Sequence, residues 1–213
     1  MGNNFIARAE HKLYIENKRR NLKNKNPSII ANNCNGGIIA HDLGLQFNSP
    51  TVNIGIWSED YLKFLNNLDY YLLTNPVNAN ERFDNGFFFS IDDVKVLFNH
   101  VDSAEEGLLN WERRKRRFNP ENMFILFCDK MGCTYDNIKE FDSLPYAHKV
   151  IFTHKPYPEF KSACYIKGFE NDSEVGVLSD WKPGFLKRRW LDDFDYVAFL
   201  NGEIYNFSTE MNK

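Results

Sequence analysis

The chain has 213 residues, of which 43% are hydrophobic and 15% aromatic, enough apolar material to bury a core without disulfides or a structural metal. Its 26 basic and 29 acidic residues give a formal net charge of −3, which excludes the strongly basic balance of a nucleic-acid-binding domain. We therefore expect no nucleic-acid partner.

Signals for membrane insertion, secretion and metal binding are missing from the sequence. No run approaches the roughly 18 apolar residues of a transmembrane helix, and residues 1–6 lack the apolar core of a signal peptide. The four cysteines are irregularly spaced, which favours reduced thiols over a disulfide framework or a zinc site. These features predict a cytoplasmic protein without a bound metal.

Residues 1–27 form a polar, basic segment that is compatible with a helix. Lys18, Arg19 and Arg20 lie close to Lys23 and Lys25. One interpretation is a solvated arm or a peripheral helix. The other is a patch that touches anionic lipid head groups and holds the protein at the inner face of the membrane. Residues 28–213 are expected to form a single α/β domain.

From residue 28 onward, short apolar runs alternate with helical periodicity, which is typical of α/β layering. We predict strands at 28–31, 49–57, 86–89, 94–98, 122–127, 148–153 and 163–166, with 86–98 as a hairpin. Helices are predicted from Ser58, from Ser103 to about Arg117 and from Thr134, with a helix or strand at 190–200. The expected fold is a three-layer, Rossmann-like α/β fold with a mostly parallel sheet, helices on both faces and an N-terminal helical arm.

The segment 32–37, Asn-Asn-Cys-Asn-Gly-Gly, directly follows the first predicted strand. Ligands of open α/β sheets bind beyond the carboxyl ends of the strands. Gly36 and Gly37 would allow close approach to a ligand, and Asn32 and Asn33 offer amide donors and acceptors, so the segment suits a phosphate or a sugar. The alternative is a tight turn in which Gly and Asn serve geometry only. Neither a dinucleotide fingerprint nor a Walker loop is present.

Cys34 in this segment has two interpretations. Cys34 is a candidate nucleophile if a helix N-terminus and His41 or another histidine lower the pKa of its thiol. A small packing cysteine is the alternative, and the better supported one.

Three further strand ends carry residues suited to catalysis or binding. His100 follows the hairpin and is a candidate general base, with a structural histidine as the alternative. Asp129 follows the run 122–127 and could bind a ribose, a metal or a sugar hydroxyl. His154 and Lys155 follow the run 148–153 and suit acid–base chemistry and phosphate binding, respectively.

The remaining candidates lie outside the strand ends. Arg114 belongs to the basic run 113–117 and is three residues from Trp111, so one of the two is expected to point inward. The alternative for this run is a solvated helix end. Trp181 has a carboxylate and a cation beside it, a composition that suits stacking on a base or a sugar. The alternative is a surface turn that is held by a half-buried tryptophan.

Several of these segments together resemble a bacterial family usually described as exopolysaccharide biosynthesis proteins. The shared motifs are Asn32-Asn33-Cys34-x-Gly-Gly with Ser49-Pro50-Thr51-x-Asn53, His100-Val-Asp-Ser103-x-Glu105-Glu106, Trp111-Glu-Arg113-Arg114-x-x-Arg117, Asn122-x-Phe124 and Val150-Ile-Phe152-Thr153-His154-Lys155. The resemblance covers about residues 28–200 and departs from the family at Val101, where an aromatic residue is common. It implies a role in capsule or other surface polysaccharide, without assigning catalytic residues.

The predicted function is a cytoplasmic transferase that moves a glycosyl, acyl or phospho-alcohol group onto a nucleotide-linked or lipid-linked saccharide. The alternative is a non-catalytic saccharide-binding or scaffolding protein of the same pathway that uses Trp111, Trp181 and the run 113–117. A hydrolase is less supported, because no nucleophile elbow is present. No cofactor is assigned.

Overall fold

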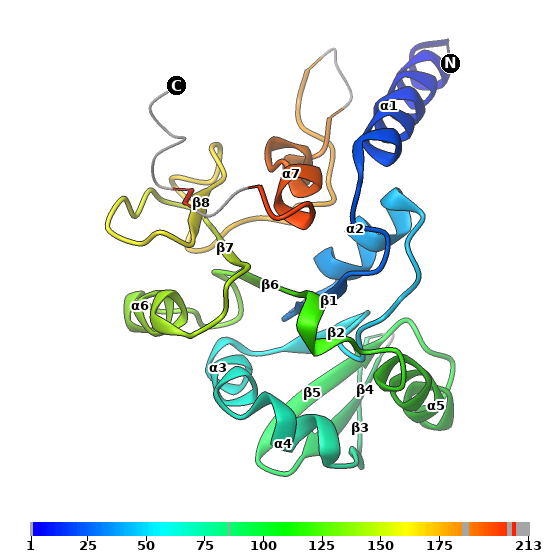
Figure 1. Ribbon diagram of the computed structural model, residues 1–213, viewed down its shortest axis with the longest axis vertical. Coiled ribbons are helices and arrows are strands. Elements are labelled where there is room, and N and C mark those ends of the chain that lie inside the picture. The colour runs from blue at the N-terminus through cyan, green and yellow to red at the C-terminus, as the bar shows by residue number, and fades with distance from the viewer. Residues whose placement is uncertain (1, 85, 185–187, 204–205, 208–213) are drawn as a thin grey trace.

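The computed structural model describes residues 2–84, 86–184, 188–203 and 206–207 (Figure 1). Its strands form two sheets of four. Sheet A is parallel, in the order β1-β6-β7-β8, and consists of β1 (Ser28–Ala31), β6 (Met123–Cys128), β7 (Lys149–Thr153) and β8 (Ala163–Tyr165). Sheet B is antiparallel, in the order β2-β5-β4-β3, and consists of β2 (Ile54–Ile56), β5 (Val94–Asn99), β4 (Gly86–Ile91) and β3 (Val77–Phe83).

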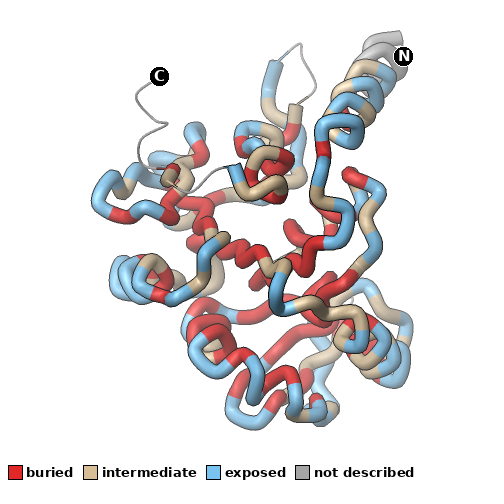
Figure 2. Tube along the Cα trace, viewed as in Figure 1, coloured by how far each residue is buried: buried red, intermediate tan, exposed pale blue. Residues whose placement is uncertain are grey.

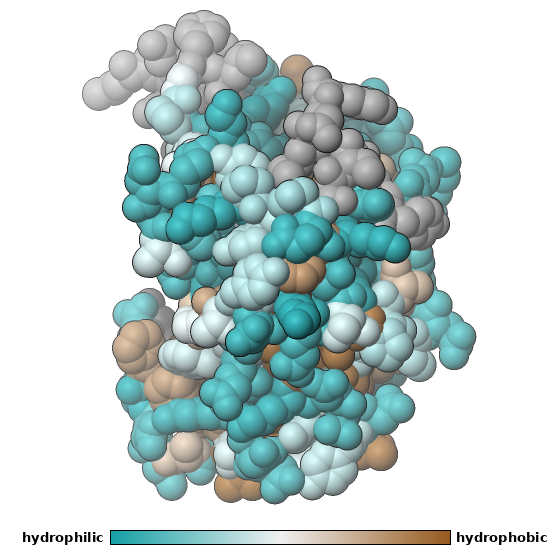
Figure 3. Space-filling view, turned by 90° about the vertical axis from the view of Figure 1, so that its left-hand side faces the viewer, coloured by the Kyte–Doolittle hydropathy of each residue, from teal (hydrophilic) through white to brown (hydrophobic). Residues whose placement is uncertain are grey.

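The helices cover both faces of sheet A and one face of sheet B. They are α1 (Gly2–Asn21), α2 (Asn35–Leu43), α3 (Ser58–Asn66), α4 (Leu68–Leu73), α5 (Ala104–Lys115), α6 (Tyr135–Ser143) and α7 (Tyr196–Leu200), with short 3₁₀ turns at Pro120–Asn122 and Trp190–Asp193. Among the described residues, no helix is long and apolar enough to cross a membrane. The face in Figure 3 is mostly hydrophilic, with hydrophobic side chains in small, separate groups.

Two apolar clusters hold these layers together, one on each face of sheet A. Alternate residues of a strand point to opposite faces of its sheet, so neighbouring residues of β1 belong to different clusters. Ile30 packs in the cluster with sheet B, α3, α5 and α6. Ile29 packs in the cluster with α2 and α7. The buried parts of the chain run along the strands of both sheets (Figure 2). The molecule therefore has three layers. Helices α2 and α7 form the first, sheet A forms the second, and α3, α6 and sheet B together form the third.

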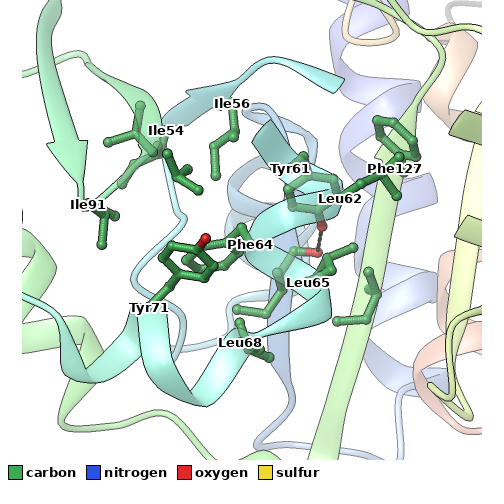
Figure 4. Packing of buried hydrophobic residues seen from close by; sticks show 14 of the residues in the cluster. Ile54, Ile56, Tyr61, Leu62, Phe64, Leu65, Leu68, Tyr71, Ile91 and Phe127 are labelled. Carbon is green, nitrogen blue, oxygen red and sulfur yellow. Dashed lines mark hydrogen bonds between the residues drawn. The ribbon is translucent and has the colours of Figure 1, made fainter. Parts of the chain in front are cut away.

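Tyr61 ties sheet A to α3, the helix that follows β2 of sheet B. Its side chain is fully buried, and its hydroxyl donates hydrogen bonds to the main-chain oxygens of Leu126 at 2.9 Å and Ile30 at 3.2 Å. It packs among Leu62, Phe127 and other apolar residues (Figure 4). One side chain thus fixes α3 to two neighbouring strands of sheet A.

The α/β class, the central strand at 122–127 and the hairpin at 86–98 are confirmed. The expected parallel sheet is present as sheet A, and the other half of the strands form a second, antiparallel sheet that was not expected. The order of sheet A also runs in one direction, without the reversal that marks the ligand crevice of doubly wound folds.

Of the two predicted serine caps, one is found in the structure and one is not, for a local reason. Ser58 is the first helical residue and does not cap α3; its hydroxyl donates to the main-chain oxygen of Lys130 instead. Ser103 does cap α5, and accepts a hydrogen bond from the Glu106 main-chain N–H. Ser103 therefore caps its helix, whereas the hydroxyl of Ser58 is bound to a residue distant in sequence.

The basic N-terminal segment is a helix packed on the protein. Ile15 of α1 and Leu22 just beyond it are buried, and Arg19 donates to the main-chain oxygen of Asp42 at 2.5 Å. Lys18 lies 3.8 Å above the Tyr196 ring. Several of the basic groups therefore contact the protein itself.

Candidate functional site

Polar residues gather where three neighbouring strands of sheet A end. Because β1, β6 and β7 are parallel neighbours, their carboxyl ends lie at one edge of the sheet. Asn32 follows β1, Asp129 follows β6, and His154 follows β7. All three residues are buried. The sheet therefore brings together the strand-end residues that the sequence singled out.

Asp129 and His154 form a buried pair at this edge. The Nδ1 atom of His154 lies 2.6 Å from Asp129 Oδ2, and the His154 main-chain N–H donates to the same oxygen at 2.8 Å. Asp129 Oδ1 accepts a third hydrogen bond, from the Val175 main-chain N–H at 2.7 Å. Burial raises the pKa of Asp129, and the donors from His154 and Val175 oppose that rise. The contact with Asp129 fixes the orientation of the imidazole ring. Nε2 is the ring nitrogen that does not contact Asp129.

Asn32 is fully buried and joins the two sheets. Its side-chain oxygen accepts from the Cys128 main-chain N–H at 3.1 Å, and its main-chain oxygen accepts from the Ile56 N–H at 2.9 Å. Its Nδ2 group has no partner among the described residues. Asn33 is half-buried, and its side-chain oxygen accepts from the Asn35 main-chain N–H at 3.0 Å. Asn32 is therefore placed to hold strands, and Asn33 to start α2.

Gly36 and Gly37 lie in the first turn of α2, so the segment 32–37 is not one continuous turn: its last three residues are helical. A Cβ atom on Gly36 would lie 3.1 Å from side-chain carbons of both Ala31 and Ile29, and one on Gly37 would lie 3.0 Å from Asn53 Oδ1. Both glycines are buried. They allow α2 to approach β1 and the chain before β2, and this packing accounts for them without a ligand.

A Gly36→Ala substitution tests this assignment. Alanine normally stabilises a helix by about 1 kcal/mol relative to glycine, but the added methyl group meets two buried side chains at 3.1 Å. Overpacking of this kind typically costs about 1–3 kcal/mol, so we expect a net loss of stability in urea unfolding. A variant more stable than the parent protein would show that the glycine is not required for packing.

Cys34 and His100 meet at the same edge, from different sheets. Cys34 precedes α2, and its sulfur lies 3.9 Å from His100 Nε2. His100 follows β5, is exposed, and has a positive φ of 57°. Burial raises the pKa of the Cys34 thiol, which disfavours the thiolate that a nucleophile needs. His41 lies in the last turn of α2, at the opposite end of that helix, so it does not activate Cys34.

The reactivity of Cys34 gives a direct check on its role. A free cysteine has a pKa of about 8.5, and the pKa of Cys34 is raised from its ordinary value. We therefore expect Cys34 to react more slowly with iodoacetamide at pH 7 than a cysteine in an unfolded peptide, and to speed up as the pH rises. Peptide mass spectrometry would follow the label, with a Cys34→Ser variant as control. Rapid labelling at pH 7 would contradict a packing role.

Other predicted site residues lie elsewhere or are already engaged. Trp111 and Arg114 both point inward from α5, and Arg114 donates to the Val52 main-chain oxygen at 2.6 Å. Burial lowers the pKa of Arg114. Trp181 packs edge-on against His11 of α1, with ring centroids 4.8 Å apart. Lys155 is exposed just past β7. The burial of Trp111 removes it from any partner-binding surface.

Comparison with known proteins identifies the family. Residues 4–201 match a family model described as a domain of unknown function, DUF1919. The chain belongs to this family. A Haemophilus influenzae protein described as an uncharacterized protein is 40% identical over 183 residues, which is 86% of this chain and 88% of that protein. These descriptions show the DUF1919 family and name no activity.

Two further residues near the strand ends of this DUF1919 chain could not be found by sequence reasoning. Glu174 accepts from the Met131 main-chain N–H at 3.1 Å and lies 3.6 Å from the Lys130 ammonium group. Val175 donates to Asp129. Both residues come from an irregular segment more than 40 positions away, so no strand or helix pattern could place them. They hold the loop after β6 against the rest of the site.

Proposed function

We propose that the protein is a transferase that moves a group from an activated donor to a saccharide hydroxyl, with His154 as the general base. The observation that carries this proposal is the buried Asp129 and His154 pair at the carboxyl ends of neighbouring parallel strands. A carboxylate that accepts a hydrogen bond from Nδ1 favours the imidazole tautomer with its proton on Nδ1. The other ring nitrogen, Nε2, can then accept a proton.

The proposed reaction uses His154 Nε2 as the proton acceptor. The proton of the saccharide hydroxyl passes to Nε2 while the oxygen of that hydroxyl forms a bond to the transferred group. The bond between that group and the donor's leaving group breaks, and the leaving group departs with the electron pair. Asp129 stabilises the imidazolium that forms. The saccharide as acceptor class rests on the sequence resemblance to exopolysaccharide biosynthesis proteins.

Donor binding and transfer test this function in two steps. A thermal-shift screen would use a nucleotide sugar, an acyl-coenzyme A and a nucleotide-linked phospho-alcohol, because a ligand at 100 times its Kd stabilises by about 2.7 kcal/mol. With a stabilising donor, transfer to saccharides would be measured. We expect His154→Gln to lower kcat by about 10²–10⁴-fold, the usual contribution of a general base, while donor binding persists.

A His41→Gln variant is the matched control, since His41 is exposed at the far end of α2. Its kcat is expected to equal that of the parent protein. Unchanged kcat in His154→Gln would overturn the assignment of the base. A protein that no donor class stabilises would overturn the transferase itself.

A further inference from the structure

The outer face of sheet B carries aromatic side chains and no covering helix in the described part of the chain. The buried side chains of α3, α4 and α5 all pack with Phe89, Val96 and Phe98, on the inner face. On the outer face, β-strand register aligns Phe88 with Leu97, and Leu97 with Gly55. Residues of three strands therefore lie side by side there, with side chains from Phe88 and Leu97.

Three rings form a continuous surface on this outer face. The Trp57 ring lies 5.8 Å from Phe88, and Phe83 lies 6.2 Å from Phe88 on the other side. Trp57 is 37% exposed and Phe83 is 59% exposed. Leu97, between Phe88 and Gly55 in the register, is only 5% exposed. The rings thus cover the sheet beneath them and present their own surface to solvent.

A polar side chain, Asn99, lies on the same face of sheet B, in register with Gly86 and Phe83. A Cβ atom on Gly55 would lie 3.4 Å from Asn99 Nδ2, and one on Gly86 would lie 3.1 Å from Asn99 Oδ1. The two glycines therefore leave room for the Asn99 amide between them. Asn99 is half-buried, and its amide makes no hydrogen bond to another side chain or main-chain group in the described residues. We call Trp57, Phe83, Phe88 and Asn99 the aromatic face.

This aromatic face adjoins the candidate site. His100 follows Asn99 directly, and its Nε2 lies 3.9 Å from Cys34. Ser58 follows Trp57, and its main-chain N–H donates to the main-chain oxygen of Met131, two residues beyond Asp129, at 3.4 Å. The aromatic face is therefore joined, through His100 and Ser58, to residues that surround the strand ends.

The charges around the aromatic face carry no positive excess. Glu81 and Asp84 border it together with Lys95, and all three are exposed, whereas Arg82 lies on the opposite face of sheet B, 4.6 Å from the Phe87 ring. Lys95 pairs with Glu81 at 2.8 Å and lies 4.1 Å above the Phe88 ring. Nucleic acids and anionic lipids are bound by an excess of positive charge, which this face lacks. An uncharged ligand with both apolar and hydroxyl-bearing surface is complementary to it.

We propose that the aromatic face binds a neutral saccharide, the acceptor of the reaction proposed above. The rings pack on the C–H faces of successive sugar units, and the Asn99 amide hydrogen-bonds their hydroxyls. The term acceptor rests on the proposed transferase, whereas saccharide binding stands on the geometry of this face.

Binding to a glycan array that carries neutral and acidic oligosaccharides tests the proposal. The labelled full-length protein is expected to bind at least one neutral glycan. Trp57→Ala and Asn99→Ala are each expected to weaken that binding at least tenfold in titration calorimetry. Tyr70→Ala is the matched control, because Tyr70 is 53% exposed and lies on α4, which packs on the inner face of sheet B. Thermal unfolding would verify that each variant is folded.

The outcomes separate this inference from the proposed function. If no neutral glycan binds, or if Trp57→Ala and Asn99→Ala bind as the parent protein does, the inference is overturned. Self-association that is lost in Phe83→Asp, without glycan binding, would also overturn it in favour of a second copy. Glycan binding that persists in a protein with no transferase activity would refute the transferase alone. Transfer with an unchanged acceptor KM in Trp57→Ala would refute the aromatic face alone.

Discussion

Replacing Asp129 with alanine is expected to destabilise the protein by about 3 kcal/mol or more. The substitution leaves the main-chain N–H groups of His154 and Val175 without their acceptor in a buried region. An unsatisfied buried donor costs about 1–3 kcal/mol, and two are created. The His154 ring also loses its partner on Nδ1. Urea unfolding would show the loss as a lower midpoint at constant slope.

Two companion variants sharpen the Asp129 experiment. Asp129→Asn keeps one acceptor oxygen but places an amide donor among the three donors that face Asp129. The free energy of unfolding of this variant should therefore lie between those of the parent protein and the alanine variant. Asp172 is exposed, and its alanine variant should fall within about 0.5 kcal/mol of the parent. If Asp129→Ala were equally mild, the carboxylate would not be the group that joins the strand ends.

A Trp111→Ala substitution is expected to destabilise the protein by about 3–5 kcal/mol, the usual cost of deleting a large buried aromatic side chain. Trp111 is only 1% exposed and stacks on Phe98 with ring centroids 5.9 Å apart. It fixes α5 to the inner face of sheet B. The free energy of unfolding from urea titration measures this effect.

The indole nitrogen of Trp111 has no hydrogen-bond partner among the described residues, so Trp111→Phe loses packing but no hydrogen bond. Phenylalanine should therefore recover part of the lost stability. Leu109 lies on the same helix and is 71% exposed, which makes Leu109→Ala the matched control, with little expected change. A Trp111→Ala variant as stable as the Leu109 control would show that α5 is held in another way.

The central parallel strands could be predicted because their apolar runs are strong and bounded. The run at 122–127 became β6, which pairs with β1 and β7, and the parallel pairing placed Asp129 beside His154. The strand-end rule needs only the position of a residue after a strand. It therefore located this pair without knowledge of the rest of the fold.

Pairing direction and side-chain partners could not be predicted in the same way. Val77–Phe83 lacks a buried face, so no alternation of apolar residues marks it as β3. Gly36 and Gly37 suit either a ligand or close helix packing by composition, and only the distances to Ala31 and Asn53 decide. Likewise, nothing in the sequence near Asp129 points to Val175, because the two are joined only by the tertiary fold.

The bonds of Asn32 have a consequence for the thermodynamics of binding. This residue is held by Cys128 of sheet A through its side chain and by Ile56 of sheet B through its main chain. The start of the candidate site is therefore ordered before any ligand arrives. Immobilising a mobile side chain costs about 0.5–1.5 kcal/mol of affinity, and a preorganised segment of this kind avoids much of that cost.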